Sequence, residues 1–488
     1  MYDLLLKQKS KIAIYGIYLI VFLYSVYPES DKDWGWHYRY GEYFIKNWHI
    51  LRHDIYSWTL SGYEWVNHSW TYDIFQYLAM KAFGFTGLSF LGALFATLTF
   101  FFIVKNFHLS FWKLALLATF YSYLSQISLE EGLRSQVVSL CLFGLLMFLL
   151  IKYKDKPKKL YWLAPLFLVW VNAHADFVFG IIIFLIFIVT NSLKHYFNKG
   201  GDIYKIFFEY VKPFLLSIVV TFINPFTYAI YSESPRHLAN SYLTNILEWD
   251  PLFGNCDSCH PYVFLIFSGI LLLLFIRAFK KKDIEVLPYA ILAIGFFLPT
   301  YYTRRYLPVY VVITMPALAM YLEEVKFNLE KYKITFLVFI VVSTLLLEYN
   351  LYNRFTSNHI YHYTEEDYCV FSSSCSIKMS EYLIDYPPIG RGFTFYDWGG
   401  YLIGKGIPAR LFVDGRMHVW SKDGYQPFGD YIEMYYHGNY KLFRSYDFDW
   451  LLIPNDSDLS QRLMKSQDLG VWKLEFQDGI ANYFVKQR

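Results

Sequence analysis

The chain has 488 residues, of which 55% are hydrophobic and only 17% are charged. A soluble protein of this length carries roughly a quarter of charged residues, so the composition excludes an ordinary soluble protein and favours a membrane protein. The formal net charge of +3 is too small to indicate a nucleic-acid partner, and five cysteines are too few for a disulfide-rich scaffold.

The first apolar segment, residues 12–28, follows a short basic tail. A helix of this length just crosses the hydrocarbon core of a bilayer. The segment lacks the small-residue cleavage site of a signal peptide, so we expect it to be the first membrane span. The polar region that follows, residues 28–73, is expected to be a long first outer loop.

More apolar segments continue along the chain. Two flank a basic link at 105–113, one begins near residue 135, and the others cover 160–175, 177–193, 212–225, 261–279, 284–301, 306–322 and 333–350. With the first segment they predict a polytopic α-helical membrane protein of about eleven transmembrane helices.

The lysines orient these spans. Alternate links are rich in lysine, namely 105–113, 152–159, 194–205, 277–282 and 326–333. Cytoplasmic links carry the excess of positive charge. We therefore expect a multi-pass protein of the plasma (bacterial inner) membrane with a cytoplasmic N-terminus and with residues 351–488 outside the cytoplasm.

The C-terminal region, residues 351–488, has a mixed polar composition with turn signals. Residues 392–403 have the pattern of a strand, a turn and then a strand or helix, and strand patterns also occur at 410–417 and 448–454. The region is long enough to bury a core of its own. We therefore divide the chain into a transmembrane module, residues 1–350, and a small extracytoplasmic α/β domain, residues 351–488.

Polar residues at the membrane edge gather on the outer side of this topology. They are Asp31, Asp33, His37, Arg39, Glu130, Glu131, Arg134, Asn172, His174, Asp176, Asn224, Glu248, Asp250, Arg304 and Arg305. Charged groups at membrane depth are costly and mostly face a cavity. Their recurrence on one side predicts a single outward-facing polar cavity. The alternative, that loop ends simply carry polar residues, explains one such site better than five.

The densest of these sites is DKDWGWHYRYG, residues 31–41. We expect a helix along the membrane surface, on which Asp33 and His37, four residues apart, share a face. A carboxylate and an imidazole held together can move a proton. Asp33 is the first candidate for the base and Asp31 the second. The alternatives are that Asp33 stabilises the helix N-terminus and that His37 only bonds a neighbouring loop.

Several short motifs follow one another along nearly the whole chain. The first outer loop supplies Asp31, Asp33, Trp36, His37, Gly41, Asp54, Ser57, Thr59, Trp65, His68 and Trp70. Later come RSQ (134–136), NAHADF (172–177), NP (224–225), EW (248–249), RR-x-x-P (304–308), YDWGGYL (396–402) and VDGR (413–416). In order and spacing these motifs resemble bacterial membrane proteins of the GT-C glycosyltransferase superfamily.

The resemblance implies a glycosyltransferase, either hexosyl or pentosyl. Enzymes of this superfamily pass a sugar from a polyprenyl-phosphate carrier to an acceptor on the non-cytoplasmic side, and a carboxylate of the first outer loop is the base. It implies Asp33, Asp31 and His37 as catalytic residues. The implied partners are a polyprenyl-phosphate-linked sugar, an acceptor that is a glycan, a lipid or a protein, and membrane lipids.

The leaving group of such a reaction is a lipid phosphate, whose growing negative charge needs cations. Arginine is favoured over histidine because its fork matches phosphate oxygens and stays charged. The candidates for binding the donor phosphate are Arg304, Arg305, Arg134 and His174. The candidates for binding the acceptor or lining the cavity are Glu248, Asp250, His68 and Asp176.

We expect no metal and no cofactor. Some members of the superfamily use a divalent cation, for which Asp31, Asp33, Glu248 and Asp250 are the candidate ligands. CDSCH, residues 256–260, matches the attachment motif of a c-type haem at Cys256, Cys259 and His260. A disulfide between the two cysteines, or two thiols, is favoured over haem. Cys369 and Cys375 are candidates for a second disulfide across a small loop.

The motifs of the C-terminal region allow two interpretations. Gly399 and Gly400 suit a tight turn close to another backbone. Asp397, Asp414 and Arg416 suit either the binding of an acceptor glycan or a buried ion pair that fixes the domain. We favour the structural role.

Two other classes of function compete with the transferase. A transporter or flippase of a lipid-linked glycan also needs an amphipathic cavity, but transporters show internal repeats, and the long first loop has no counterpart later in the chain. A scaffold whose outer domain binds partners leaves the membrane-edge Asp, His and Arg residues without a purpose. The transferase explains most of the pattern.

Overall fold

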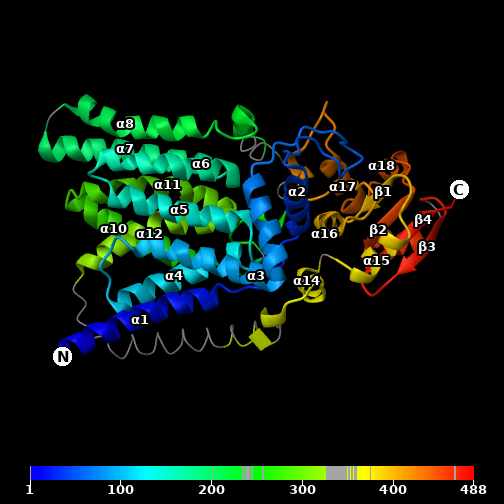
Figure 1. Ribbon diagram of the computed structural model, residues 1–488, viewed down its shortest axis with the longest axis horizontal. Coiled ribbons are helices and arrows are strands. Elements are labelled where there is room, and N and C mark those ends of the chain that lie inside the picture. Colours follow the sequence, from blue (N-terminus) through cyan, green and yellow to red (C-terminus); the bar gives the residue numbers. More distant parts are fainter. Residues whose placement is uncertain are drawn as a thin grey trace. The chain divides into compact units, whose positions relative to one another are not determined.

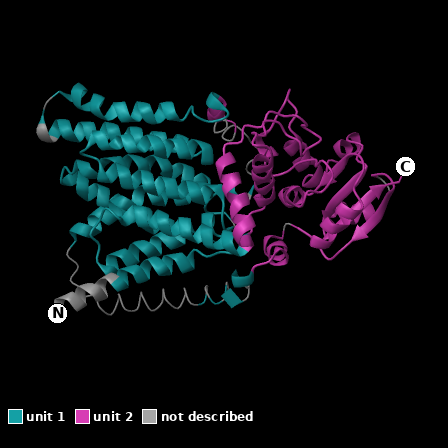
Figure 2. Ribbon diagram, viewed as in Figure 1, with its two compact units in different colours: residues 1–29, 86–228, 245–362 teal, residues 30–85, 229–244, 363–488 magenta. Residues whose placement is uncertain are grey.

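The computed structural model describes residues 2–200, 202–232, 236, 242, 246–254, 256, 258–325, 349, 352, 355–356, 360–373, 375–465 and 469–487. The chain forms two compact units, coloured separately in Figure 2. Unit 1 comprises residues 1–29, 86–228 and 245–362, and unit 2 comprises 30–85, 229–244 and 363–488. Residues 30–73 of the predicted first outer loop thus belong to the same compact unit as the C-terminal region.

Unit 1 is a bundle of helices that lie side by side (Figure 1). They are α1 (Tyr2–Tyr24), the later part of α3 (Trp70–Val104), α4 (Phe111–Leu129), α5 (Ser135–Lys152), α6 (Leu163–Ala173), α7 (Phe177–Lys199), α8 (Ile203–Val220), α10 (Pro261–Lys280), α11 (Leu287–Tyr302) and α12 (Leu307–Glu324). Each apolar segment predicted between residues 12 and 322 coincides with one of them. The predicted span at 333–350 falls almost wholly outside the described residues.

Six described helical segments are long and apolar enough to cross a membrane. They are Trp70–Val104, Ser135–Lys152, Phe177–Phe197, Pro261–Lys280, Ile284–Tyr302 and Arg304–Glu324. A shorter apolar helix covers Ile12–Tyr24. The chain is therefore a helical membrane protein, and the predicted count of about eleven spans stays a prediction.

The long helix α3 consists of two helices joined at a break. Gly84, at φ 62° and ψ −167°, interrupts the helical backbone. A positive φ strains residues that carry a Cβ, whereas glycine adopts it freely. The boundary between unit 2 and unit 1 follows directly, after Phe85.

Unit 2 contains a four-stranded sheet in the order β1-β2-β4-β3. The strands are β1 (Gly392–Thr394), β2 (Trp450–Pro454), β3 (Trp472–Gln477) and β4 (Ala481–Lys486). β1 runs parallel to β2, whereas β4 is antiparallel to both β2 and β3. The edge strand β3 alternates between partly buried and exposed residues, as expected for a strand with one solvated face.

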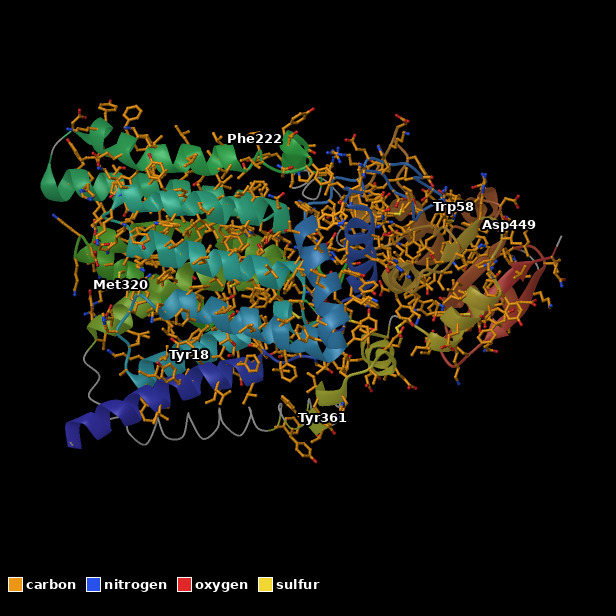
Figure 3. The ribbon with its side chains drawn as sticks, in the orientation of Figure 1. Tyr18, Trp58, Phe222, Met320, Tyr361 and Asp449 are labelled. Atoms are coloured by element: carbon orange, nitrogen blue, oxygen red, sulfur yellow. A yellow bond between two sulfur atoms is a disulfide. The ribbon has the colours of Figure 1, made fainter. Side chains whose placement is uncertain are left out.

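The helices of unit 2 complete an α/β arrangement. They are α2 (Trp34–Asn47), α14 (Glu365–Ser372), α15 (Ile377–Asp385), α16 (Gly399–Lys405), α17 (Pro427–Tyr435), α18 (Tyr440–Ser445) and α19 (Asp458–Lys465). Trp58 of the first outer loop, labelled in Figure 3, donates from Nε1 to the carbonyl of Gly392 in β1, at 3.0 Å. The outer loop is therefore part of this core.

One strand prediction is wrong. Residues 410–417 do not join the sheet, and their only strand-like pairing is an isolated parallel bridge between Leu411 and Ser57. Leu411 donates its N–H to Tyr56 and accepts from Trp58, at 2.8 and 3.1 Å. The buried, extended pattern is real, but its hydrogen-bond partner is the first outer loop.

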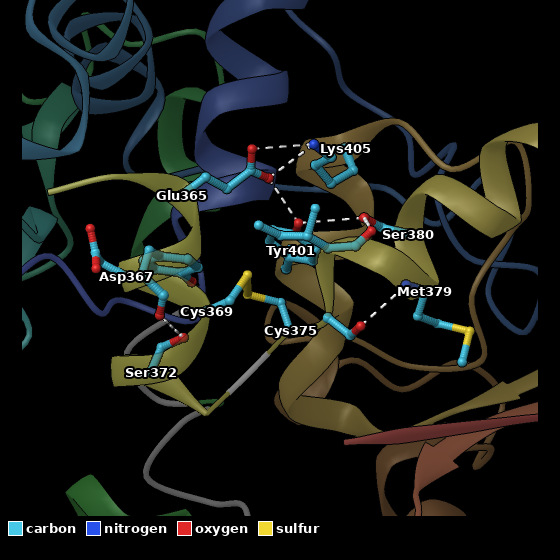
Figure 4. Close-up of a disulfide and its surroundings, with 12 residues drawn as sticks. Glu365, Asp367, Cys369, Ser372, Cys375, Met379, Ser380, Tyr401 and Lys405 are labelled. Carbon is cyan, nitrogen blue, oxygen red and sulfur yellow. Dashed lines mark hydrogen bonds and ion pairs between the residues drawn. A yellow bond between two sulfur atoms is a disulfide. The ribbon is translucent and has the colours of Figure 1, made fainter. Parts of the chain in front are cut away.

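Both predicted cysteine pairs are disulfides in the structure. Cys369 in α14 is bonded to Cys375, and close by Glu365 pairs with Lys405 at 2.9 Å (Figure 4). Cys256 is bonded to Cys259 in unit 1. Each disulfide closes a loop of only a few residues, so its main effect is to fix the local backbone.

Candidate functional site

The predicted surface helix begins at the lead motif. Asp33 is the N-cap of α2, but its backbone is helical and its side chain makes no capping hydrogen bond. The carboxylate of Asp31 is buried and accepts the backbone N–H of Asp33 at 3.2 Å. Tyr368 donates its hydroxyl to the backbone carbonyl of Asp31 at 2.8 Å. The hydrogen bonds of Asp31 thus fix the backbone at residues 31–33, which carries the Asp33 side chain.

Glycines of the two C-terminal motifs lie directly against this turn. Gly400 is in contact with the backbone of Lys32 and Asp33, and Gly415 is in contact with the Asp33 carboxylate, so that a Cβ at either position would collide. Asp397 of the first motif pairs with Lys32 at 2.5 Å. YDWGG and VDGR therefore surround the candidate base, and their glycines are needed because of close approach.

His37 is buried in a hydrogen-bonded network with a partner that the sequence did not reveal. Its Nδ1 lies 2.5 Å from the Asp73 carboxylate at the start of α3. Asn67 and Ser69 donate to the same carboxylate at 2.6 and 3.2 Å. His68, between them in the chain, is partly buried. His37 shares its helix with Asp33, but its ring is bonded to Asp73.

Arg416 of the VDGR motif forms a buried ion cluster. It makes a bidentate pair with Asp414, at 2.7 Å for both bonds, and its Nη1 lies 2.8 Å from Asp54. The guanidinium also lies over the rings of Trp65 and Trp420, at 4.6 and 5.1 Å. Burial lowers the pKa of Arg416, but the two carboxylates outweigh burial and raise it. The cluster matches the structural interpretation of Asp414 and Arg416.

A second constellation lies at one end of unit 1. Arg134 at the start of α5 and Arg305 in a short helix (Arg304–Tyr306) bind the two carboxylate oxygens of Glu248, which stands in the short helix Leu247–Trp249. Arg134 also binds Glu131 at 2.6 Å. Two predicted phosphate-binding arginines and one predicted cavity residue therefore meet at a single point.

The electrostatics keep Glu248 ionised. Burial raises the pKa of its carboxyl group, but the charges of Arg134 and Arg305, and hydrogen bonds from Arg134 and Gln136, outweigh burial. The pKa is lowered to about 2. The Arg305 guanidinium also lies 5.2 Å from the centre of the Trp249 ring, so its position is fixed by a charge and by an aromatic face.

Asp176 and His174 form the adjoining pair. His174 Nδ1 lies 3.1 Å from the carboxylate of Asp176, and Ser139 lies 3.2 Å from the same oxygen. Burial raises the pKa of Asp176, but the charge and hydrogen bond of His174, followed by the charge of Arg305, outweigh it and lower the pKa to about 2. Trp170 donates to Ser139 at 2.9 Å and so completes the network.

Arg304 is directed to a different partner from Arg305. It is buried, and its Nη2 lies 3.3 Å from the carboxylate of Asp250. Its backbone N–H donates to the carbonyl of Asp250 at 3.0 Å, and its Nη1 lies 3.9 Å from Cys259 Sγ. Of the two neighbouring arginines, Arg305 thus contacts the Glu248 cluster, whereas Arg304 holds the loop that carries it.

The candidate ligands for a cation belong to two units. Asp31 and Asp33 lie in unit 2, whereas Glu248 and Asp250 lie in unit 1. Within the described ranges, no three His, Cys, Asp or Glu side chains converge as a metal site. The haem motif has both of its sulfur atoms bonded to each other.

Several residues of these networks were not singled out from the sequence, among them Asp73, Ser139 and Trp170. Asp73 stands at the start of a predicted span, where a carboxylate is easily taken for a helix cap. Ser139 and Trp170 lie within apolar runs. The sequence signal that identified site residues was a polar group at the end of an apolar segment, and every predicted phosphate-binding residue has that position.

Comparison with known proteins supports the fold. No protein-family model and no curated protein matches the sequence. The structure is similar to the oligosaccharyltransferase of Archaeoglobus fulgidus in the apo form, with 12% identity, a TM-score of 0.55, and coverage of 90% of this chain and 69% of that chain. The archaeal oligosaccharyltransferase AglB from the same organism, in complex with an inhibitory peptide and a dolichol-phosphate, matches with the same identity and coverage and a TM-score of 0.56.

These two similarities extend over most of the chain at an identity that shows the fold alone. The helical bundle and the C-terminal α/β unit are both included in a match of that extent. The chain therefore has the fold of these archaeal oligosaccharyltransferases.

Proposed function

We propose that the protein is a membrane glycosyltransferase that moves a sugar from a polyprenyl-phosphate carrier to an acceptor on the outer face of the membrane. The observation that carries this proposal is the fold, which is similar to AglB over 90% of the chain. One of the AglB structures holds a dolichol-phosphate, a carrier of the proposed class. The acceptor is a glycan, a lipid or a protein.

The cluster around Glu248 supports a site for the donor phosphate. Arg134 and Arg305 bring two guanidinium groups to one carboxylate, and guanidinium groups match phosphate oxygens in geometry and charge. His174 stands beside them through Asp176. Arg304 supports the loop from the other side. As the sugar leaves, the guanidinium groups of Arg134 and Arg305 stabilise the charge that develops on the phosphate.

The turn around Asp33 supports a general base. Its carboxylate is only partly buried, whereas that of Asp31 is fully buried and hydrogen-bonded to the backbone. Asp33 takes the proton of the acceptor hydroxyl while the oxygen forms a bond to the anomeric carbon and the bond from that carbon to the phosphate oxygen breaks. Asp31 and His37 position this turn. Glu248, Asp250, His68 and Asp176 are proposed as cavity or acceptor contacts.

The test is transfer of labelled sugar from lipid extracts of the native cell by the purified full chain. Asp33→Asn is compared with Asp423→Asn, the same chemical change at an exposed turn of unit 2. A lost general base lowers the rate by about 100-fold or more, so we expect that loss in the first variant and normal transfer in the second. The unfolding temperature of each variant confirms that it is folded.

Two outcomes contradict the proposal in different ways. Full activity of Asp33→Asn removes Asp33 from the base role and leaves Asp31 as the next candidate. If the wild-type protein transfers no sugar from any lipid pool but moves lipid-linked glycan across vesicles, the transferase is wrong and the transporter is the function.

A further inference from the structure

The described part of unit 1 contains a cavity that the proposed reaction does not use. It has a volume of about 350 Å³ and lies between the ends of α3, α5 and α12, the middle of α7 and the start of α11. Half of its lining is apolar. The polar half consists of Asn106, Lys152, Lys154, Asn191, Glu285 and Glu323. Such a mixed lining suits a ligand with a polar group and an apolar portion.

This cavity and the Glu248 cluster lie at opposite ends of unit 1. The helix α5 begins at Ser135, next to Arg134, and ends 18 residues later at the cavity residue Lys152. At 1.5 Å per residue it spans about 27 Å, close to the thickness of the bilayer core. Met320, labelled in Figure 3, brings the far end of α12 to the same cavity. The cavity therefore opens at the other membrane face.

Asn191 presents a polar group that lacks a protein partner. Its side chain is only 9% exposed and lines the cavity. Within the described ranges its carboxamide makes no hydrogen bond, so its donor and acceptor groups remain available to a ligand in the cavity. The cavity is too large to be filled by one water molecule, which takes about 30 Å³. It therefore has room for a ligand group that hydrogen-bonds to Asn191.

The charges at the cavity leave one ammonium group without a carboxylate. Lys154 binds Glu285 at 2.9 Å, and Lys194 binds the same carboxylate. Glu323 lies 3.0 Å from the ring of His108. Lys152, in contrast, has no carboxylate partner in the part of the chain that the structure describes, and lies 4.9 Å from the centre of the Phe148 ring. The exposed ammonium group of Lys152 can therefore pair with an anion in the cavity.

The position of Lys152 in the chain indicates which class of anion the cavity binds. Lys152 begins the lysine-rich link 152–159, which the distribution of charge assigns to the cytoplasmic side. Basic pockets between helices on that side bind anionic lipid headgroups. We propose that this cavity binds the headgroup of an anionic phospholipid, with the phosphate on Lys152 and an ester or hydroxyl oxygen on Asn191. Phe187, Tyr289 and Met320 contact the first methylenes of the lipid.

Binding of phosphatidylglycerol to the purified full chain, measured by native mass spectrometry without any sugar donor, tests this inference independently of transfer. The variants are Lys152→Gln and Asn191→Leu, and the control is Lys158→Gln, an exposed lysine of the same link that does not line the cavity. One lysine near a phosphate contributes about fivefold in affinity. We expect that loss in Lys152→Gln, a loss of similar size in Asn191→Leu because a hydrogen bond to the lipid is removed, and wild-type binding in the control.

A further measurement distinguishes a phospholipid from inorganic phosphate as the ligand. Excess inorganic phosphate is expected to leave lipid binding unchanged, because the free ion lacks the apolar portion. Displacement by inorganic phosphate alone would make the cavity a phosphate site and overturn the lipid assignment. Unchanged lipid binding in Lys152→Gln and Asn191→Leu, with both variants folded by their unfolding temperature, would remove the site altogether.

Discussion

At the scale of single residues, the central feature is one carboxylate shared by two arginines. A buried charge that loses its partner is costly, whereas a fully paired one is tolerated. Glu248 is paired on both oxygens, and the neighbouring Asp176 is paired with His174. The low pKa of both carboxyl groups means that the cluster stays ionised over the whole physiological range of pH.

The first prediction is a loss of stability in acid. Glu248 has a pKa of about 2 in the folded protein and 4.5 as its ordinary value. A carboxyl group with a lowered pKa stabilises the folded state above the ordinary value, and this contribution disappears as the pH falls through the folded value. We expect the unfolding temperature to fall between about pH 5 and pH 2, with up to about 3 kcal/mol from Glu248.

The variant Glu248→Gln provides the comparison for this pH series. It lacks the titrating group, so it should be less stable than the wild type at pH 7 and should approach it at low pH. Thermal unfolding of the detergent-solubilised protein measures both curves. Parallel curves at all pH values would show that the ionised form of Glu248 does not stabilise the fold.

The second prediction concerns Glu29, which the structure makes a positioning residue for Arg134. Its buried carboxylate accepts the backbone N–H of Leu133 at 2.8 Å, and Gly132, at φ 83°, lies against it with no room for a Cβ. Glu29→Ala leaves a buried N–H without that acceptor, a loss of about 1–3 kcal/mol. We expect about tenfold higher KM for the lipid-linked donor and a smaller change in kcat.

Rescue by a conservative variant distinguishes positioning from a general loss of stability. Glu29→Gln keeps an acceptor oxygen of the same reach, so it should restore most of the donor affinity. Glu381→Ala, on an exposed part of α15, should change neither constant. Equal defects in Glu29→Ala and Glu29→Gln would mean that the negative charge itself is required, and the positioning role would be wrong.

Sequence reasoning found the members of these clusters but not their pairing. Arg134, Glu248 and Arg305 each stand out because they are charged groups at the end of an apolar run. Their partners are far apart in the sequence, so no local spacing reveals that Arg305 binds Glu248 while Arg304 binds Asp250. His37 shows the same limit, because Asp33 lies within one helical turn whereas its observed partner, Asp73, lies on another helix.

At the scale of elements, the packing of α2 on α16 holds the candidate base. Gly35 of α2 is in contact with the backbone of Gly400 and Gly404 in α16. Two helices approach this closely only where side chains are absent from the contact. The same glycine, Gly400, also contacts Asp33, so a change in this packing is transmitted to the turn that carries the carboxylate.

The third prediction follows from that contact. Gly35→Ala adds a methyl group where backbone atoms already stand, and overpacking of this kind costs about 1–3 kcal/mol. We expect a lower unfolding temperature and a loss of transfer activity that exceeds the loss of folded protein. Gly479→Ala is the matched control, since its Cβ would meet open space. A stable and fully active Gly35→Ala variant would contradict the proposed transmission.

The elements themselves were predictable to different degrees. Long apolar runs predict helices reliably because the backbone inside a bilayer must form its hydrogen bonds within the segment. The predicted spans from 12 to 322 all fall on helices. Residues 450–454 also form the expected strand. The prediction of a strand over residues 411–413 was wrong. An extended segment can form its backbone hydrogen bonds with any neighbouring segment, and here that neighbour is residues 56–58 of the first loop.

At the scale of the whole molecule, the membrane topology determines what each site can meet. The distribution of lysines assigns the links at 152–159 and 277–282 to the cytoplasm. The same alternation assigns the first loop and residues 351–488 to the outer side. The donor-phosphate cluster would then face the outer leaflet, and the cavity at Lys152 would face the inner one.

The last prediction tests this assignment with single cysteines in a Cys141→Ser background, in which the remaining native cysteines form the two disulfides. Exposed residues of the outer regions, Asn47→Cys and Lys422→Cys, should react with a membrane-impermeant maleimide on intact spheroplasts. Lys158→Cys and Lys281→Cys should react only after permeabilisation, because they belong to lysine-rich links that resist translocation. Labelling of Lys422→Cys only after permeabilisation would place unit 2 in the cytoplasm, where an Asp33 base could not serve an outer acceptor.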